Sequence, residues 1–114
     1  MSTKTCTWTG FSGSKYNYFV HELPAGFEEN QDGNYIFTKL IEDTHYPIYI
    51  GEGDLGKRIS NSHHKAACIL LKGATHVHEH LNPNQQNRTT EEDDLLANYP
   101  NAYAPAGCNV KLGG

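Results

Sequence analysis

Several side chains in this sequence have the chemistry to bind a phosphate group or a metal ion. Arg58 offers a planar fork of donors that suits phosphate oxygens. An acidic run at positions 91–94 supplies carboxylate oxygens, which Mg²⁺ prefers as ligands. Tyr35 and Tyr49 are phenols within apolar segments, and a phenol can hold water or phosphate by hydrogen bonds. These side chains can act together only if the fold brings them to one place.

Three alternating histidines suggest a different chemistry. On a β-strand His76, His78 and His80 would project from one face, where they could gather Zn²⁺ or another transition metal. Residues on the same face of a strand are nearly 7 Å apart, roughly twice the rise per residue. One ion would therefore need further ligands from elsewhere, and a polar, partly exposed strand is the interpretation that the spacing favours.

The elements expected to carry these residues form an α+β fold. Residues 15–21, 34–40 and 46–51 have the composition of strands, and the polar turn at 42–45 makes the last two an antiparallel hairpin. Cross-strand neighbours lie about 5 Å apart at Cβ, so Tyr35 and Tyr49 could meet at one phosphate. The alternative is that they are two half-buried strand tyrosines. The fold class expected is a small antiparallel sheet of three to four strands flanked by helices.

Helices are expected around this sheet. Asp54 is a candidate N-cap of a helix in which Leu55 and Ile59 share a face and which ends at positions 63–64. A short apolar segment at 66–71 could be helical and stops at Gly73, and the alternation at 74–81 predicts a strand. Thr89 or Thr90 is expected to cap a last helix that ends before Pro100.

Five short motifs occur in a characteristic order. They are Gly33-Asn34-Tyr35, Tyr49-Ile50-Gly51, Leu55-Gly56-Lys57-Arg58, the segment from Arg88 to Leu96, and Cys108-Asn109. This ordered set, over residues 33–109, resembles the GIY-YIG nuclease superfamily. The helix Arg88-x-x-x-Glu92-x-Asp94-Leu95-Leu96 resembles the R-x-x-x-E-x-D-L-I helix that precedes a terminal P-x-C-N in some members.

The resemblance implies a metal-dependent endonuclease that hydrolyses phosphodiester bonds. Such hydrolysis needs a positioned water, a proton relay and positive charge on the phosphoryl oxygens. By resemblance, Tyr35 and Tyr49 would activate and position the water, and Arg58 would stabilise the phosphate. Glu92 would be the single metal ligand, for Mg²⁺ or Mn²⁺ that keeps most of its waters. A phenol of pKa near 10 is a poor base at neutral pH, so a nearby cation must assist it.

Further site residues follow from the same resemblance. Some members place a histidine one helical turn after the arginine; Ser62 stands at that position here, and His63 follows as a candidate for proton transfer. Its alternate is His64, and the plain interpretation is two solvent-facing histidines at a helix end. Gly51 and Asn109 are expected at the bound substrate.

Length and composition indicate one domain. A chain of 114 residues is too short for two cores, so we expect a loosely held lead-in at 1–14 and one domain over 15–114. No apolar run of about 18 residues and no signal-peptide pattern is present, which favours a cytoplasmic protein that does not enter a membrane. The three cysteines fall in no C-x-x-C pair and are expected to be reduced and structural.

The expected partner is a nucleic acid, with DNA favoured over RNA. A net charge of −4 is unusual for such a protein, although four of its thirteen acids lie together at 91–94 and the net value conceals the local distribution. A homodimer or a separate targeting chain could supply specificity. Two other functions stay open: an inactive GIY-YIG-like binding module, and a metal-binding protein centred on the histidine strand.

Overall fold

The computed structural model describes residues 4–60 and 63–111, which form a five-stranded antiparallel sheet with helices on both faces. The strand order across the sheet is β1-β2-β5-β3-β4. Along the chain the elements are β1 (Thr5–Thr9), β2 (Lys15–Glu22), β3 (Asp32–Ile41), β4 (Thr44–Asp54), α1 (Leu55–Arg58), α2 (Ala66–Leu71), β5 (His76–Leu81), α3 (Gln85–Asn98) and a 3₁₀ turn (Pro100–Ala102). The α+β class is confirmed, with five strands where three to four were expected.

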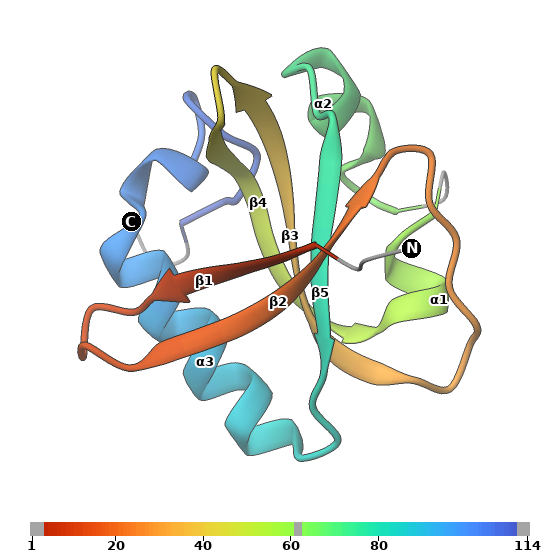
Figure 1. Cartoon of the computed structure of the whole chain (residues 1–114), viewed down its shortest axis with the longest axis vertical. Helices are drawn as coiled ribbons and strands as arrows, with labels where there is room; N and C mark the ends of the chain where they lie inside the picture. Colours follow the sequence, from red (N-terminus) through yellow and green to blue (C-terminus); the bar gives the residue numbers. More distant parts are fainter. Residues whose placement is uncertain (1–3, 61–62, 112–114) are drawn as a thin grey trace.

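The additional strand is β1, in the segment that was expected to be a loose lead-in. It pairs antiparallel with β2, with Trp8 opposite Tyr16, and the Trp8 side chain is buried. The expectation was wrong because the Ser, Thr and Gly composition is weakly informative, and this strand is stabilised by pairing and by burial of one aromatic side chain. Figure 1 shows the β1–β2 hairpin turned across the other three strands.

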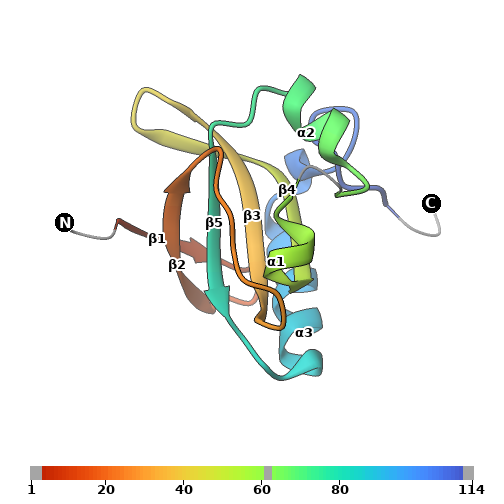
Figure 2. The same ribbon diagram turned by 90° about the vertical axis from the view of Figure 1, so that its right-hand side faces the viewer.

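Two hydrophobic clusters lie on opposite faces of the sheet, because successive strand residues point to opposite sides. On β3, Tyr35 and Phe37 belong to one cluster, and Ile36 between them belongs to the other. The first cluster includes buried residues of α1 and α2, which Figure 2 shows on the same side of β3 and β5. The second includes Leu95 of α3. The sheet thus separates two hydrophobic cores and contributes side chains to both.

The β3–β4 hairpin agrees with its prediction. It reverses at Glu42 and Asp43, which both have positive φ, a conformation that acidic residues and asparagine tolerate better than most side chains. In the ladder Tyr35 lies opposite Gly51, and Phe37 lies opposite Tyr49. The two tyrosines are therefore diagonal neighbours on one face of the sheet.

The helices differ from expectation mainly in their ends. The Asp54 side chain caps α1 as predicted, by accepting from the Lys57 amide, but α1 ends at Arg58 and does not reach positions 63–64. At the other long helix, Asn84 is the N-cap and accepts from the Asn87 amide, so α3 starts four residues before Thr89. The amide-rich residues 85–87 belong to its first turn. None of the described helices is long and apolar enough to span a membrane.

The cysteine prediction was wrong for two of the three residues. Cys68 of α2 and Cys108 form a disulfide, with their Cα atoms 6.0 Å apart. Cys6 on β1 is free. Forty residues separate the bonded pair, and no local pattern marks them. The bond ties α2 to the C-terminal segment that runs beside β4.

Candidate active site

The two motif tyrosines lie side by side at the centre of the β3–β4 pair. Their rings are nearly parallel, with centroids 6.0 Å apart and an interplanar angle of 24°. Gly51 makes this arrangement possible, since a Cβ there would lie 2.5 Å from the Tyr35 hydroxyl and 2.9 Å from the Tyr49 ring. The glycine of the second motif is therefore a packing requirement that admits the two tyrosine rings, and its expected place at the bound substrate stays a prediction.

His63 joins this pair from the loop before α2. Its Nε2 lies 2.8 Å from the Tyr35 hydroxyl, and its Nδ1 accepts a hydrogen bond of 2.9 Å from the Lys65 amide. A neutral imidazole that accepts at Nδ1 carries its proton on Nε2, so His63 donates to Tyr35. Burial, assisted by the positive charges of His64 and Arg58, lowers the pKa of His63 to about 4. At neutral pH this ring is a neutral donor.

Tyr35 connects His63 with Tyr49. Burial raises the pKa of both phenols, so both hydroxyls keep their protons at neutral pH. The Lys65 amide thus orients His63, His63 holds the Tyr35 hydroxyl, and the Tyr35 ring stacks against Tyr49. Only Tyr49 faces a cleft, because Tyr35 is 1% exposed.

This arrangement changes the role expected for Tyr35. Burial, more than any charge, raises its pKa far above the ordinary value of a phenol. A buried, protonated phenol cannot remove a proton from a water molecule that it does not touch. Any effect of Tyr35 or His63 on a ligand in the cleft would therefore pass through Tyr49. Ser62, the other position considered for the histidine, lies outside the described residues.

Arg58 extends the site on one side. It is the last residue of α1 and is exposed, and it takes part in none of the ion pairs found among the described residues. Gly53 has φ +134°, and a Cβ there would lie 2.8 Å from the Arg58 Nε, so glycine leaves room for the guanidinium. Beside Arg58 lies a hollow of about 360 Å³, which we call the Arg58 hollow. Its lining residues are Asp54, Lys57, Arg58, His63 and His64.

Glu92 stands on the other side, on α3. It lines a cleft of about 530 Å³ with Tyr49 and His64, which we call the Glu92 cleft. Burial raises the pKa of Glu92 to about 7, the negative charges of Glu52 and Asp93 add to the shift, and Arg58 opposes it. A carboxylate that is desolvated among other acids is poised to exchange its proton for a cation.

The donor set fits a cation that keeps most of its waters. Among residues 4–60 and 63–111, no group of three or more histidine, cysteine or acidic side chains is arranged to hold a metal ion. A transition-metal site of several protein ligands is therefore not formed by these residues. A single carboxylate suits Mg²⁺ or Mn²⁺, which bind through few protein oxygens.

Basic side chains gather at this site despite the negative net charge. Two lysines, Lys65 and Lys111, line the Glu92 cleft, and Lys57 and Arg58 line the Arg58 hollow. These are four of the nine basic residues of the chain. Three carboxylates share the two hollows, and one of them, Asp54, is engaged as a helix cap. The local charge is thus more positive than the net charge.

Asn109 holds the backbone of β4 beside the site, and its expected place at the bound substrate stays a prediction. Its side-chain oxygen accepts from the Ile50 amide at 2.8 Å, and its side-chain nitrogen donates to the Ile50 carbonyl at 2.9 Å. The amide thereby mimics a neighbouring strand along β4, at the residue between Tyr49 and Gly51. Asn109 also lines the Glu92 cleft, but both of its polar atoms are engaged with the backbone.

Two glutamates near the site, Glu52 and Glu91, are held by hydrogen bonds to other elements of the fold. Arg88 donates from Nε to Glu52 at 2.9 Å and from Nη1 to the Asn82 carbonyl, so Glu52 is held near Glu92. Glu91, the first of the four acids at positions 91–94, is 4% exposed.

The Glu91 carboxylate is held on the sheet side of α3. It accepts a hydrogen bond from Tyr18 and lies 2.6 Å from the His80 Nε2, which raises the pKa of His80 against the opposing effect of burial. Glu91 anchors α3 so that the next residue, Glu92, turns to the cleft. Its partners are distant in sequence, so no local signal could have identified them.

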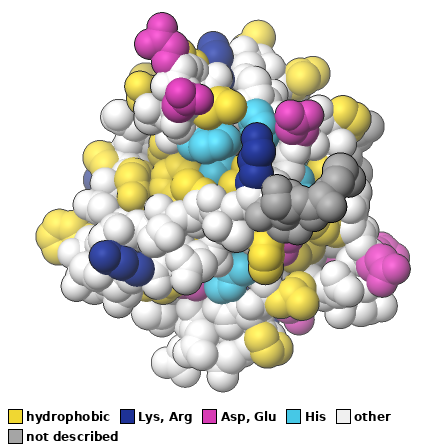
Figure 3. Space-filling view, in the orientation of Figure 1, with side chains coloured by type: hydrophobic (Ala, Val, Ile, Leu, Met, Phe, Trp, Pro, Cys, Tyr) yellow, Lys and Arg dark blue, Asp and Glu magenta, His cyan; other side chains and the backbone are white. Residues whose placement is uncertain are grey.

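The three alternating histidines share a face of β5 but do not form one site. The Trp8 indole donates to the His78 Nδ1 at 3.0 Å, which leaves the proton on Nε2, the atom that lies 3.2 Å from His45. A protonated nitrogen cannot bind a cation. His80 is engaged with Glu91 instead. Figure 3 shows histidine side chains reaching this face of the molecule in more than one place.

Comparison with known proteins gives no match to a family model, a curated protein or a solved structure. The resemblance to the GIY-YIG nucleases therefore remains a prediction from the sequence motifs.

Proposed function

We propose that this protein is a metal-dependent nuclease that hydrolyses phosphodiester bonds, with DNA as the expected substrate. The observation that carries the proposal is the contact of three side chains beside the Glu92 cleft: His63 is hydrogen-bonded to Tyr35, Tyr35 stacks against Tyr49, and Tyr49 lines the cleft with Glu92. Arg58 lies in the adjoining hollow, and His64 borders both spaces. Separate elements, β3, β4, α1 and α3, thus contribute the motif side chains to one region of the surface.

The proposed roles follow from exposure and chemistry. Arg58 is exposed and binds the phosphate through its planar guanidinium. Tyr49 donates a hydrogen bond from its hydroxyl to a phosphate oxygen, and Tyr35 and His63 fix its orientation. Glu92 holds the divalent cation together with water molecules. The cation, when bound, supplies positive charge to the phosphoryl oxygens and makes water more acidic.

A second candidate is a fold that binds nucleic acid without cutting it. Glu52, held by Arg88, places a second negative charge near Glu92 and would repel a phosphate there. The two candidates differ only in whether cleavage occurs. The expected cytoplasmic location also stays a prediction, and the Cys68–Cys108 disulfide weighs against it because disulfides persist mainly in oxidising compartments. A homodimer or a targeting chain is likewise untested.

The decisive experiment is cleavage of supercoiled plasmid, single-stranded DNA and branched DNA with Mg²⁺, Mn²⁺ or EDTA. We expect cation-dependent cleavage that falls at least about 100-fold in Glu92→Gln and Tyr49→Phe. Two matched controls should retain activity: Tyr46→Phe changes an exposed tyrosine of the same strand, and Glu22→Gln changes an exposed glutamate of β2. A folded protein that cuts none of these substrates with either cation would refute the nuclease proposal and leave the binding module.

A further inference from the structure

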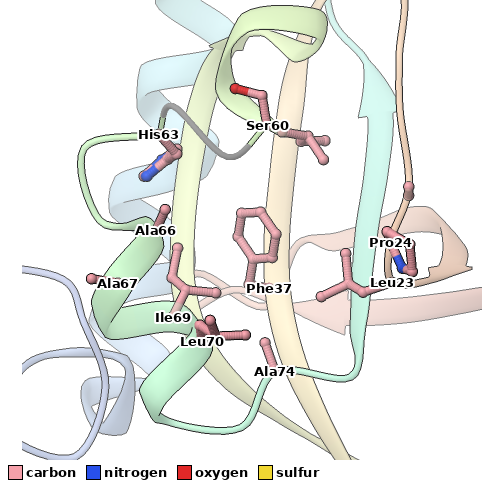
Figure 4. Close-up of a pocket in the computed structure, with 12 residues that line it drawn as sticks. Leu23, Pro24, Phe37, Ser60, His63, Ala66, Ala67, Ile69, Leu70 and Ala74 are labelled. Atoms are coloured by element: carbon pink, nitrogen blue, oxygen red, sulfur yellow. The ribbon is translucent and has the colours of Figure 1, made fainter.

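A third hollow adjoins the site and differs from the other two in character. It is an apolar cavity of about 580 Å³ between α2, β3 and the segment that follows β2. Figure 4 shows the Phe37 ring in its middle, with α2 side chains on one side and Leu23 and Pro24 on the other. Its lining includes Leu23, Phe37, Ile59, His63, Ile69 and Leu70.

His63 separates this apolar cavity from the phosphate side of the site. The same side chain lines the apolar cavity and the Arg58 hollow, so the two spaces meet across one imidazole ring. Its ring lies edge-to-face to Phe37, with centroids 6.1 Å apart. An apolar space and a cationic space are therefore adjacent, with an aromatic wall between them.

A nucleotide has the matching arrangement of chemistry. Its base is flat and apolar on both faces, and its phosphate is anionic and lies one sugar away. We propose that the apolar cavity receives the base of the nucleotide whose phosphate is bound at Arg58. This proposal rests on the proposed function, because it assigns the base-binding part of the same site.

The lining determines what kind of recognition is possible. Phe37, Ile59 and Ile69 present carbon atoms, which favour the faces of a base over its hydrogen-bonding edges. Every base has such faces, so the cavity would accept bases with little sequence preference. A base can enter only after it leaves the stack. The inferred substrate is accordingly single-stranded or locally unpaired nucleic acid.

Leu70 and Leu71 provide a matched pair for a test. Both are exposed leucines of α2, at 78% and 86%, but only Leu70 lines the cavity. Leu70→Asp therefore places a negative charge at the rim of the cavity. Leu71→Asp places the same charge on the neighbouring residue, which does not line the cavity. Because both side chains are exposed, neither change should prevent folding.

The experiment is an NMR titration in EDTA with two probes, 2′-deoxyadenosine 5′-monophosphate and 2′-deoxyribose 5-phosphate. We expect the nucleotide to bind about tenfold more tightly than the sugar phosphate, with shifts in Phe37 and His63 signals. Leu70→Asp should remove this preference and Leu71→Asp should keep it. Arg58→Ala should weaken both probes alike. Equal binding of the two probes, or equal effects of the two leucine changes, would overturn the proposal.

The outcome is separable from that of the nuclease proposal. Binding in EDTA requires neither a cation nor cleavage, so Glu92→Gln should keep the preference for the nucleotide. If cleavage fails while the preference is found, the base pocket stands and the nuclease activity does not. If single-stranded DNA is cut but the probes bind equally, the nuclease stands and the base pocket is refuted.

Discussion

Gly51 lies directly opposite Tyr35 in the β3–β4 ladder, and the Tyr35 phenol fills the space that a side chain at position 51 would need. The glycine and the tyrosine of the two motifs are thus one packing unit. The Tyr49 ring borders the same space, since a Cβ at position 51 would come within 2.9 Å of it.

Gly51→Ala should therefore destabilise the protein and disturb the hydrogen bond between Tyr35 and His63. The added methyl group would push the Tyr35 ring away from His63, and overpacking of this kind typically lowers the free energy of unfolding by about 1–3 kcal/mol. Urea denaturation measures this loss. Gly26→Ala is the matched control, because a Cβ at position 26 meets no atom within 4 Å. Similar unfolding midpoints for the two variants would contradict the packing account.

A second prediction concerns the charge of Glu92. Its pKa of about 7 in the folded protein exceeds the ordinary value of 4.5, so the folded state holds the proton more tightly than the unfolded state. As pH rises from 4.5 to 7, the unfolded chain loses this proton first, and stability falls. Glu92→Gln removes that loss and should stabilise the protein by about 1 kcal/mol at pH 8, after allowance for solvent screening.

The comparison of pH 8 with pH 4 provides the internal control. At pH 4 the carboxyl is protonated in both states, so wild type and Glu92→Gln should have similar stabilities in thermal unfolding. Cation affinity has the related pH dependence: it should rise as pH increases through about 7, because the cation competes with a proton for Glu92. A Gln variant that is less stable at pH 8 would show that this carboxylate is not strained by burial.

Local signals account for what the sequence predicted well. The β3–β4 hairpin follows from alternating apolar residues around a polar turn, and the Asp54 cap follows from a side chain three residues from its partner amide. The motif residues do come together: Tyr35, Tyr49 and His63 are in ring contact. Both kinds of prediction depend on short stretches of chain, where residue type and spacing largely determine geometry.

Long-range partners account for what was missed. Strand β1 depends on Trp8, whose indole bonds to His78, 70 residues away, and no composition rule anticipates that contact. Glu91 is buried because its partners are on β2 and β5. The burial of Tyr35 was also not foreseen, and its expected role in water activation stays a prediction. Exposure depends on what packs over a residue, and in this fold Tyr49 faces the cleft while Tyr35 does not.

A third prediction follows from the buried imidazole of His78. Burial, with the nearby His45 and His76, lowers its pKa to about 3, below the ordinary value of 6.5. Between these pH values the His78 imidazole is protonated in the unfolded chain but not in the folded chain, so stability is lost as pH falls from 6.5 to 3. The expected slope is up to about 1.4 kcal/mol per pH unit for this one group.

His78→Gln should reduce the pH dependence of the free energy of unfolding by the contribution of one proton. Chemical denaturation at several pH values between 4 and 6.5, followed by the fluorescence of Trp8, the only tryptophan, measures the slope directly. The variant is expected to be less stable than wild type at pH 8, because it loses the Trp8 contact, but its stability should fall less steeply toward acid. An unchanged slope would mean that another histidine, such as His63 with its lowered pKa, dominates acid unfolding.

The disulfide gives the last prediction, because it joins α2 to the segment that carries Asn109. Cys108 donates its amide to the Ile48 carbonyl, and the next residue, Asn109, pairs with Ile50 on the same edge of β4. The bond also holds the helix that forms one wall of the apolar cavity. Reduction, or Cys68→Ser, should lower the free energy of unfolding by about 3–4 kcal/mol, the value typical of a loop of this length.

Urea denaturation with and without a thiol reductant tests this bond, with Cys6→Ser as the control. Cys6 is free, so its replacement should leave the effect of the reductant intact. An unfolding midpoint of the wild type that ignores the reductant would show that the two thiols are not bonded in solution. In that case the Asn109 segment would be held by the β4 contacts alone, and Asn109→Ala, which leaves the Ile50 amide and carbonyl without these partners, should then cause the larger loss of stability.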